Sequence, residues 1–151
     1  MKIAIDRDDA EDIINHPDIY PYVKDDGSPP TFSVPDGMVT IVVYDPDPVA
    51  CTAFHWRNST TLETHVQVLP DYRKKSLEYG EAMLEWIWSN TPAEKLIGLV
   101  HDRKTLSWTL KLGFKIEGIS PKSIQQGGKL IDQTYIGISR CQQQSHSYRQ
   151  Q

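Results

Sequence analysis

A strand–helix–strand pattern in the middle of the chain constrains the fold more than any other feature. Residues 60–69 alternate between apolar and polar side chains, as a half-buried strand does. Residues 77–88 carry apolar side chains at helical spacing, and Pro92 ends that segment. Residues 96–100, LIGLV, are a short apolar run typical of a buried strand. Because strands joined by a helix of this length pair in parallel, the two strands are expected to be parallel neighbours.

Apolar runs on either side of this unit predict further strands and helices. Residues 38–56 predict a hairpin, because two β-branched runs flank DPDP, whose prolines cannot sit inside a strand ladder. Gly127 and Gly128 mark a second turn, between strands expected at 114–119 and 130–139. The remaining expected elements are a strand at 2–5, a helix capped by Asp8 or Asp9, an irregular loop at 20–37 and a helix at 101–112. This order predicts an α/β (α+β) chain with a mixed, mostly antiparallel sheet and helices on both faces.

Composition limits the classes of protein to which the chain can belong. Its 151 residues suit one domain, expected over residues 1–140, and the polar stretch 141–151 predicts a disordered tail. The net charge of −4, with no basic segment beyond residues 73–75, argues against binding to nucleic acid. No apolar run approaches the roughly 18 residues of a membrane span, and the N-terminus lacks the apolar core of a signal peptide. A cytoplasmic protein that binds neither nucleic acid nor membrane is therefore predicted.

The segment between the first strand and the helix of the central unit has the layout of a phosphate-binding loop. Residues 66–78 read VQVLPDYRKKSLE, which is a strand, a proline, a basic run and the start of a helix. The N–H groups at a helix start, together with the helix dipole, favour a bound anion. Such loops normally carry glycines that let the backbone approach the anion, and here lysines, a serine and a glutamate stand instead. The segment is therefore either a working anion site or the remnant of one.

Two blocks of the chain, residues 66–78 and TLKLGFKIEG at 109–118, resemble the GNAT superfamily of acyl-CoA N-acyltransferases. In that family a strand leads into a loop of the pattern Q/R-x-x-G-x-G/A that opens a helix, and a later helix ends in Leu-Gly-Phe. The resemblance implies a GNAT-like sheet and an acetyl-CoA site, in which a strand holds the pantetheine arm and a helix start holds the pyrophosphate. The residues that it places along the arm are Val66 and Val68, and those at the pyrophosphate are Arg73, Lys75, Ser76 and Leu77.

The chain departs from the family pattern at both blocks. The loop glycines of the family correspond to Ser76 and Glu78, and the tyrosine that protonates the leaving thiolate corresponds to Thr109. Repulsion between a carboxylate and a phosphate charge ~4 Å apart would weaken the binding free energy by ~4 kcal/mol at an effective dielectric constant of ~20. Acetyl-CoA binding is therefore expected to be weak or absent. Glu63 and His65 are the candidates for a base that deprotonates an amine, unless both are ordinary polar residues of a sheet face.

The remaining histidines show no spacing typical of metal ligands. They are His16, His55, His101 and His146. The pair Asp6-x-Asp8 likewise lacks the central glycine and final glutamate of a calcium loop. No metal site is predicted from the sequence.

A second resemblance bears on the biological role. Residues 15–27, NHPDIYPYVKDDG, are similar to the opening of small GNAT-like proteins of tailed bacteriophages, some of which are associated with head assembly. The similarity implies an accessory protein of head assembly or virion morphogenesis, associated with the virion and with little or no acyl transfer. The Tyr20–Gly37 loop, rich in tyrosine, proline and aspartate, is the predicted contact with a protein partner such as a phage structural protein. The alternatives are an active acetyl-CoA-dependent N-acetyltransferase acting on an amine, and a protein that binds CoA without turnover.

Overall fold

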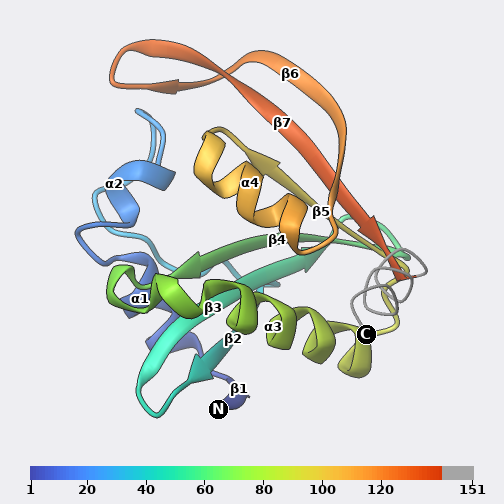
Figure 1. Cartoon of the computed structure of the whole chain (residues 1–151). Helices are drawn as coiled ribbons and strands as arrows, with labels where there is room; N and C mark the ends of the chain where they lie inside the picture. The colour runs from blue at the N-terminus through green and yellow to red at the C-terminus, as the bar shows by residue number, and fades with distance from the viewer. Residues whose placement is uncertain (141–151) are drawn as a thin grey trace.

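In the computed structural model, which describes residues 1–140, seven strands form one sheet in the order β1-β2-β3-β4-β5-β7-β6 (Figure 1). The strands are β1 (Lys2–Ile5), β2 (Val39–Tyr44), β3 (Pro48–Trp56), β4 (Thr61–Val68), β5 (Lys95–Val100), β6 (Lys115–Gln126) and β7 (Lys129–Ser139). The helices are α1 (Arg7–Ile14), α2 (Tyr20–Val23), the 3-10 helix η1 (Pro70–Lys75), α3 (Ser76–Asn90) and α4 (Arg103–Lys111). The predicted class, a mixed and mostly antiparallel sheet with helices, is confirmed.

The parallel pair predicted from the central strand–helix–strand unit is also confirmed. β4 and β5 are parallel neighbours, and α3 is the crossover that joins them. The other neighbouring strands are antiparallel. The alternation of strand direction is therefore interrupted at the centre of the sheet, where β4 and β5 run the same way.

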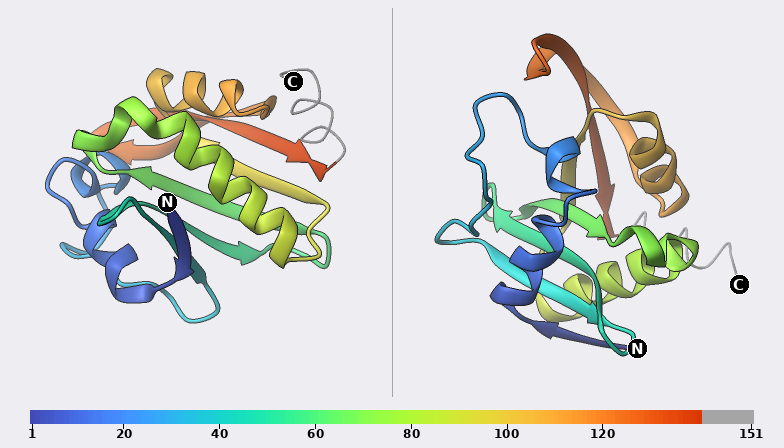
Figure 2. Two further views of the ribbon diagram at one scale, coloured as in Figure 1. Left: turned by 60° about the horizontal axis from the view of Figure 1, so that its bottom comes forward. Right: turned by 90° about the vertical axis from the view of Figure 1, so that its left-hand side faces the viewer.

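Side chains alternate between the two faces of the sheet, and each face carries its own helices. Val42 and Cys51 pack against α1 on one face, in a small cluster that includes Ala10. The larger core lies on the other face, where α3 covers the sheet. In the right-hand view of Figure 2, α1 and α3 lie on opposite sides of the sheet. The buried centre of the larger core includes Ile41, Leu62, Tyr79, Met83, Ile87, Leu96 and Ile138.

Two element boundaries differ from those predicted. Helix α1 is capped by Asp6, whose carboxylate accepts a hydrogen bond from the Asp9 N–H at 2.8 Å, so Asp8 and Asp9 lie in the first turn and do not cap it. Strand β6 runs to Gln126, well beyond its predicted end. Its second half is polar and mostly exposed, so no apolar alternation marks it in the sequence. Pairing with β7 through the backbone keeps this half extended.

The segment predicted as an irregular loop, residues 20–37, begins with the short helix α2. Tyr20 is buried, and its hydroxyl donates a hydrogen bond to the Pro29 carbonyl at 2.5 Å. Tyr22, in contrast, is 71 % exposed. Tyr20 is therefore an anchor that holds the loop to the domain, whereas the ring of Tyr22 faces solvent.

The β6–β7 hairpin closes onto this loop. Gly127 and Gly128 form the hairpin turn with φ of +57° and +78°, values that favour glycine. The Asp26 carboxylate accepts hydrogen bonds from both glycine N–H groups, at 2.8 and 2.9 Å. Gln126 Nε2 donates to the Lys24 carbonyl at 2.8 Å. Two segments that are far apart in the sequence are therefore joined at this edge of the molecule.

None of the helices within residues 1–140 is long and apolar enough to cross a membrane. The predicted disordered tail, residues 141–151, lies outside the described part of the chain. Within the described part, Cys51 is a buried free cysteine.

Replacing Glu11 by glutamine is expected to lower the free energy of unfolding by about 1 kcal/mol near neutral pH. The Glu11 carboxylate accepts a hydrogen bond from the Val34 N–H at 2.9 Å and pairs with Arg7 at 3.3 Å. The bond from Val34 is the main reason why the pKa of Glu11 lies below its ordinary value of 4.5. This contribution is present above the ordinary value and is lost as the pH falls through the lowered pKa.

Urea denaturation at about pH 7 and at about pH 3 measures this difference. The expected result is a larger loss at the higher pH than at the lower pH, because protonated Glu11 resembles glutamine. Glu81→Gln, at an exposed position of α3, is the matched control. Equal losses for Glu11→Gln at both pH values would contradict the assignment.

Candidate active site and cofactor groove

Strands β4 and β5 separate along their length, and the opening between them lies at the centre of the sheet. Their register pairs residues 61–63 with residues 95–97 and goes no further. Just beyond this point the Thr64 hydroxyl donates to a β5 carbonyl at 3.2 Å. From there β4 continues to Val68 and β5 to Val100 without pairing with each other. The facing edges of these strands therefore offer backbone N–H and C=O groups to an extended ligand.

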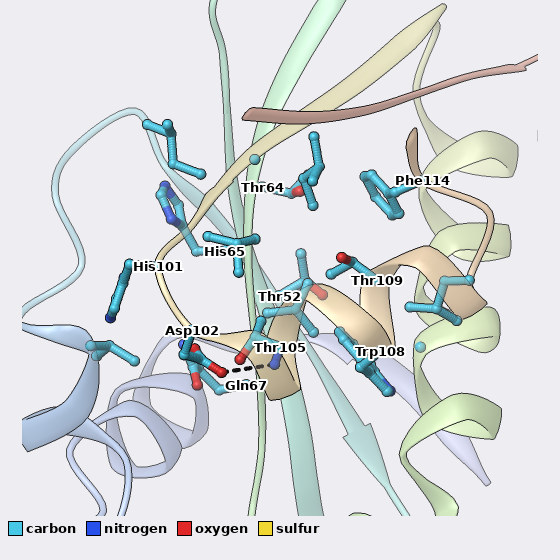
Figure 3. A pocket seen from close by; sticks show the side chains of 18 of the residues that line it. Thr52, Thr64, His65, Gln67, His101, Asp102, Thr105, Trp108, Thr109 and Phe114 are labelled. Atoms are coloured by element: carbon cyan, nitrogen blue, oxygen red, sulfur yellow. Dashed lines mark hydrogen bonds between the residues drawn. The ribbon is translucent and has the colours of Figure 1, made fainter. Parts of the chain in front are cut away.

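A cavity of about 270 Å³ fills this opening and continues between the sheet, α3 and α4 (Figure 3). Apolar side chains form most of its wall, and a few polar groups lie among them, as is typical of small-molecule sites. Lining residues on the two strands and on α4 include Thr64, His65, Val66, Gly98, Trp108 and Thr109. The cavity is therefore shaped by both edges of the opening.

Helix α4 lies close against α3 because Gly80 has no side chain. A Cβ atom at Gly80 would lie 2.8 Å from side-chain atoms of both Trp108 and Leu112. Trp108 borders the cavity and also a second hollow on the surface. The cavity and the second hollow therefore lie next to each other, with the Trp108 side chain between them.

The second hollow, of about 520 Å³, is an open groove between the start of α3 and α4. Its basic lining residues are Arg73, Lys74, Arg103, Lys104 and Lys111. Ser76 and Leu77, the first residues of α3, line it as well, and no side chain caps the start of that helix. The Ser76 N–H already donates to the Arg73 carbonyl, so the basic side chains are the groups that suit a phosphorylated ligand. This hollow is called the basic groove below.

The residues predicted to lie at the pyrophosphate divide into two groups. Arg73, Ser76 and Leu77 line the basic groove. Lys75 does not line it, because its ammonium lies 3.3 Å from the Asp45 carboxylate on the turn between β2 and β3. Lys75 therefore contacts a different side of the molecule.

Glu78, the acidic residue expected to oppose a phosphate, is exposed and does not line the basic groove. Glu78 nevertheless lies in the first turn of α3, so the weak acetyl-CoA binding predicted from its charge stays a prediction. Of the two residues predicted along the pantetheine arm, Val66 lines the cavity. Val68 packs against the larger core and does not line the cavity.

Thr109 stands at the position where the family resemblance places a tyrosine. It is buried in the cavity wall, and its hydroxyl donates to the Leu106 carbonyl at 2.8 Å. Its proton is therefore already engaged within α4. A threonine hydroxyl is also a poor acid near neutral pH.

His55, Glu63 and His65 meet on the face of the sheet that carries α1. His55 Nε2 lies 3.2 Å from Glu63 Oε2, and His65 Nε2 lies 3.6 Å from the same oxygen. Arg57 Nη1 lies 3.5 Å from the other oxygen, Oε1. Of the two base candidates, His65 lines the cavity and Glu63 does not. Desolvation lowers the pKa of His65 against the opposing effect of Glu63, although 46 % of its side chain is exposed.

Two features of the site are absent from the sequence-based predictions. Arg103 and Lys104 directly follow the N-cap Asp102, in a helical turn where the helix dipole disfavours cations. This unfavourable placement was the signal available in the sequence. The register of β3 and β4 sets His55 opposite Glu63, and no spacing or composition in the sequence shows that contact.

No family model matches the chain, and no curated protein matches it. Solved structures do match it in fold. A mutant of spermidine N-acetyltransferase SpeG from Vibrio cholerae aligns over 100 % of both chains, with a TM-score of 0.76 and 13 % identity. The protein smu.2055 from Streptococcus mutans UA159 aligns over 92 % of this chain and 99 % of its own, with a TM-score of 0.72 and 14 % identity.

A GNAT-family acetyltransferase from Bacillus anthracis shares 21 % identity, with a TM-score of 0.57 over 68 % of this chain and 66 % of its own. Identities this low demonstrate a shared fold alone. The chain therefore has the fold of the GNAT N-acetyltransferases.

Proposed function

We propose that the chain transfers an acetyl group from acetyl-CoA to an amine. The observation that carries this proposal is the opening between β4 and β5, whose cavity adjoins the basic groove at Trp108. Acetyl-CoA presents a matching series of features, namely a thioester, an extended arm with amide groups and a phosphorylated nucleotide. The fold shared with solved N-acetyltransferases supports the proposal.

The residues present suit this ligand. The open edge of β4 offers N–H and C=O groups to the amides of the arm. Arg73 and Arg103 offer positive charge and directed donors to the phosphates, and the Ser76 hydroxyl lies beside them at the helix start. Bound in this way, acetyl-CoA would supply an acetyl group already activated as a thioester.

His65 is the residue to which we assign the role of general base. It lines the cavity beside the opening, so its imidazole can take a proton from an acceptor ammonium directly or through water. The Glu63 carboxylate, 3.6 Å away, stabilises the imidazolium that results. Among residues 1–140, no tyrosine lines the cavity, so CoA would leave as the thiolate and take its proton from water.

Gly98→Leu is expected to weaken acetyl-CoA binding at least about tenfold, a loss of roughly 1.4 kcal/mol. A Cβ atom at Gly98 would lie 3.5 Å from Ile136 and from the Thr64 carbonyl, which is ordinary contact, so the backbone tolerates a side chain. The rest of the leucine would occupy cavity space between the strands. Titration calorimetry with acetyl-CoA measures the loss, and a thermal melt verifies folding.

The matched control is Gly118→Leu on the edge strand β6. A Cβ atom there has no heavy atom within 4 Å, and the position lies outside the cavity. This variant should bind acetyl-CoA as the parent does. A folded parent chain that binds no acetyl-CoA, or equal affinities for both variants, would refute the proposed function.

The role in phage head assembly stays a hypothesis drawn from residues 15–27. The solved structures named above lend it no support. Within the loop proposed to contact a protein partner, Tyr20 is buried and Tyr22 is exposed. Tyr22→Ala is therefore the substitution that tests a partner contact without removing an anchor of the loop.

A further inference from the structure

Three side chains of the kind that bind transition metals share one face of the β3–β4 hairpin. The strand register sets His55 directly opposite Glu63, and His65 follows two residues further along β4. Side chains at such positions project from the same face of a sheet. Their nitrogen and oxygen ligand atoms all lie within 4.8 Å of one another.

Two of the three distances between these atoms are close to those around a bound zinc ion, and the third, between the two nitrogens, is at most 4.8 Å. Bonds of about 2.0–2.1 Å in a tetrahedral arrangement separate neighbouring ligand atoms by about 3.3 Å. The two nitrogens lie 3.2 and 3.6 Å from Glu63 Oε2. Small side-chain rotations complete the site, and the paired strands already hold the backbone in place. Metal binding would therefore cost little conformational entropy.

Hydrogen bonding does not account for the whole cluster. A separation of 3.6 Å between His65 and Glu63 is too long for a hydrogen bond. The two imidazole rings lie nearly parallel, with 18° between their planes, and both bring Nε2 towards the same carboxylate oxygen. His55 Nδ1 is buried and has no hydrogen-bond partner among the described residues. A cation between the three ligand atoms would account for the convergence of both Nε2 atoms on Glu63 Oε2, and it leaves His55 Nδ1 as it is.

The chemistry of the ligands selects the type of ion. Imidazole nitrogen with one carboxylate suits zinc and its neighbours among the transition metals, whereas magnesium and calcium prefer oxygen ligands alone. Arg57 contacts only Oε1, and with 54 % of its side chain exposed it can turn into solvent as the ion binds. We infer that His55, Glu63 and His65 form a site for one Zn²⁺ ion.

The site adjoins the cavity, because His65 also lines the cavity wall. Three protein ligands leave a fourth position open in a tetrahedral zinc site. Zinc would bind His65, the residue assigned to accept a proton, so it would inhibit acyl transfer. This consequence rests on the proposed function, whereas zinc binding itself does not.

Zinc and cobalt titrations of the full chain, without an affinity tag and after removal of metals by a chelator, test the inference. Cobalt(II) should give the visible absorption of a four- or five-coordinate site at one equivalent, and zinc should abolish it. Magnesium in large excess should leave the absorption unchanged. Calorimetry should give a zinc dissociation constant on the order of 10 μM or tighter.

His55→Gln and His65→Gln should each weaken zinc binding at least about tenfold, whereas His16→Ala, remote from the cluster, should not. Zinc should also raise the melting temperature of the parent but not of either glutamine variant, a readout that reveals any variant that fails to fold. Absence of the cobalt spectrum overturns the site. Equal zinc affinity in the parent and in both folded glutamine variants overturns it as well. Both results are obtained without acetyl-CoA, so they are independent of the proposed acyl transfer.

Discussion

Replacing both Arg103 and Lys104 by glutamate should weaken acetyl-CoA binding at least about a hundredfold, because charge-assisted hydrogen bonds to phosphate are each worth about 1.5–3 kcal/mol. Both side chains line the basic groove opposite the start of α3. The substitutions also place negative charge where phosphates are expected to lie. Affinity should therefore fall steeply, and its dependence on salt should weaken.

The fold should survive these two substitutions. Arg103 and Lys104 occupy the first turn of α4, which contains no acidic residue. The helix dipole disfavours cations and favours carboxylates at that end. The melting temperature should therefore stay the same or rise slightly. This opposition between stability and binding is the expected signature of basic residues retained for a ligand.

Calorimetry with acetyl-CoA, repeated at low and high salt, measures the effect. The matched control is Lys115→Glu with Lys129→Glu, which changes the net charge equally at exposed positions outside the groove. Equal weakening in both double variants would show that only the overall charge matters. The basic groove would then have no specific role in binding.

The second large effect concerns Arg140, the last residue that the structure describes. Arg140→Ala should lower the free energy of unfolding by about 3 kcal/mol, because it leaves several partly buried carbonyls without donors. The guanidinium donates to the carbonyl oxygens of Trp88, Thr91 and Ala93 at 2.6 to 3.1 Å. It also lies 4.9 Å from the centre of the Trp88 ring. These carbonyls belong to the end of α3 and to the connection to β5. Helix α3 itself has no N–H groups left to donate to them.

Urea denaturation compares the parent with Arg140→Ala and Arg140→Lys. Lysine should recover only a small part of the loss, because its three N–H donors sit on one nitrogen and cannot span the carbonyls that the three guanidinium nitrogens reach. Acetyl-CoA affinity of the folded alanine variant should remain unchanged, since Arg140 lines neither the cavity nor the basic groove. A loss below about 1 kcal/mol would show that water replaces the guanidinium at these carbonyls.

Much of the architecture follows from the sequence by itself. The alternation in residues 60–69, the helical spacing in 77–88 and the apolar run at 96–100 predict the parallel pair that β4 and β5 form. The hairpin at 38–56 and the turn at Gly127 and Gly128 are likewise as predicted. Periodicity, helix breakers and turn residues are local properties, so they can be recognised without knowing which segments touch. The place of the α3 start in the basic groove is predictable in the same way, because α3 closely follows strand β4 in the sequence.

Only the tertiary structure decides which distant side chains share the site. Arg103 reaches the groove because Gly80 lets α4 pack closely against α3. His55 meets Glu63 only through the register of two strands. Glu78 and Lys75, both neighbours of the loop in sequence, lie outside the groove. Electrostatic interactions and metal affinity depend on distances of a few ångströms between side chains. Packing and strand register determine those distances, and the periodicity of the sequence does not.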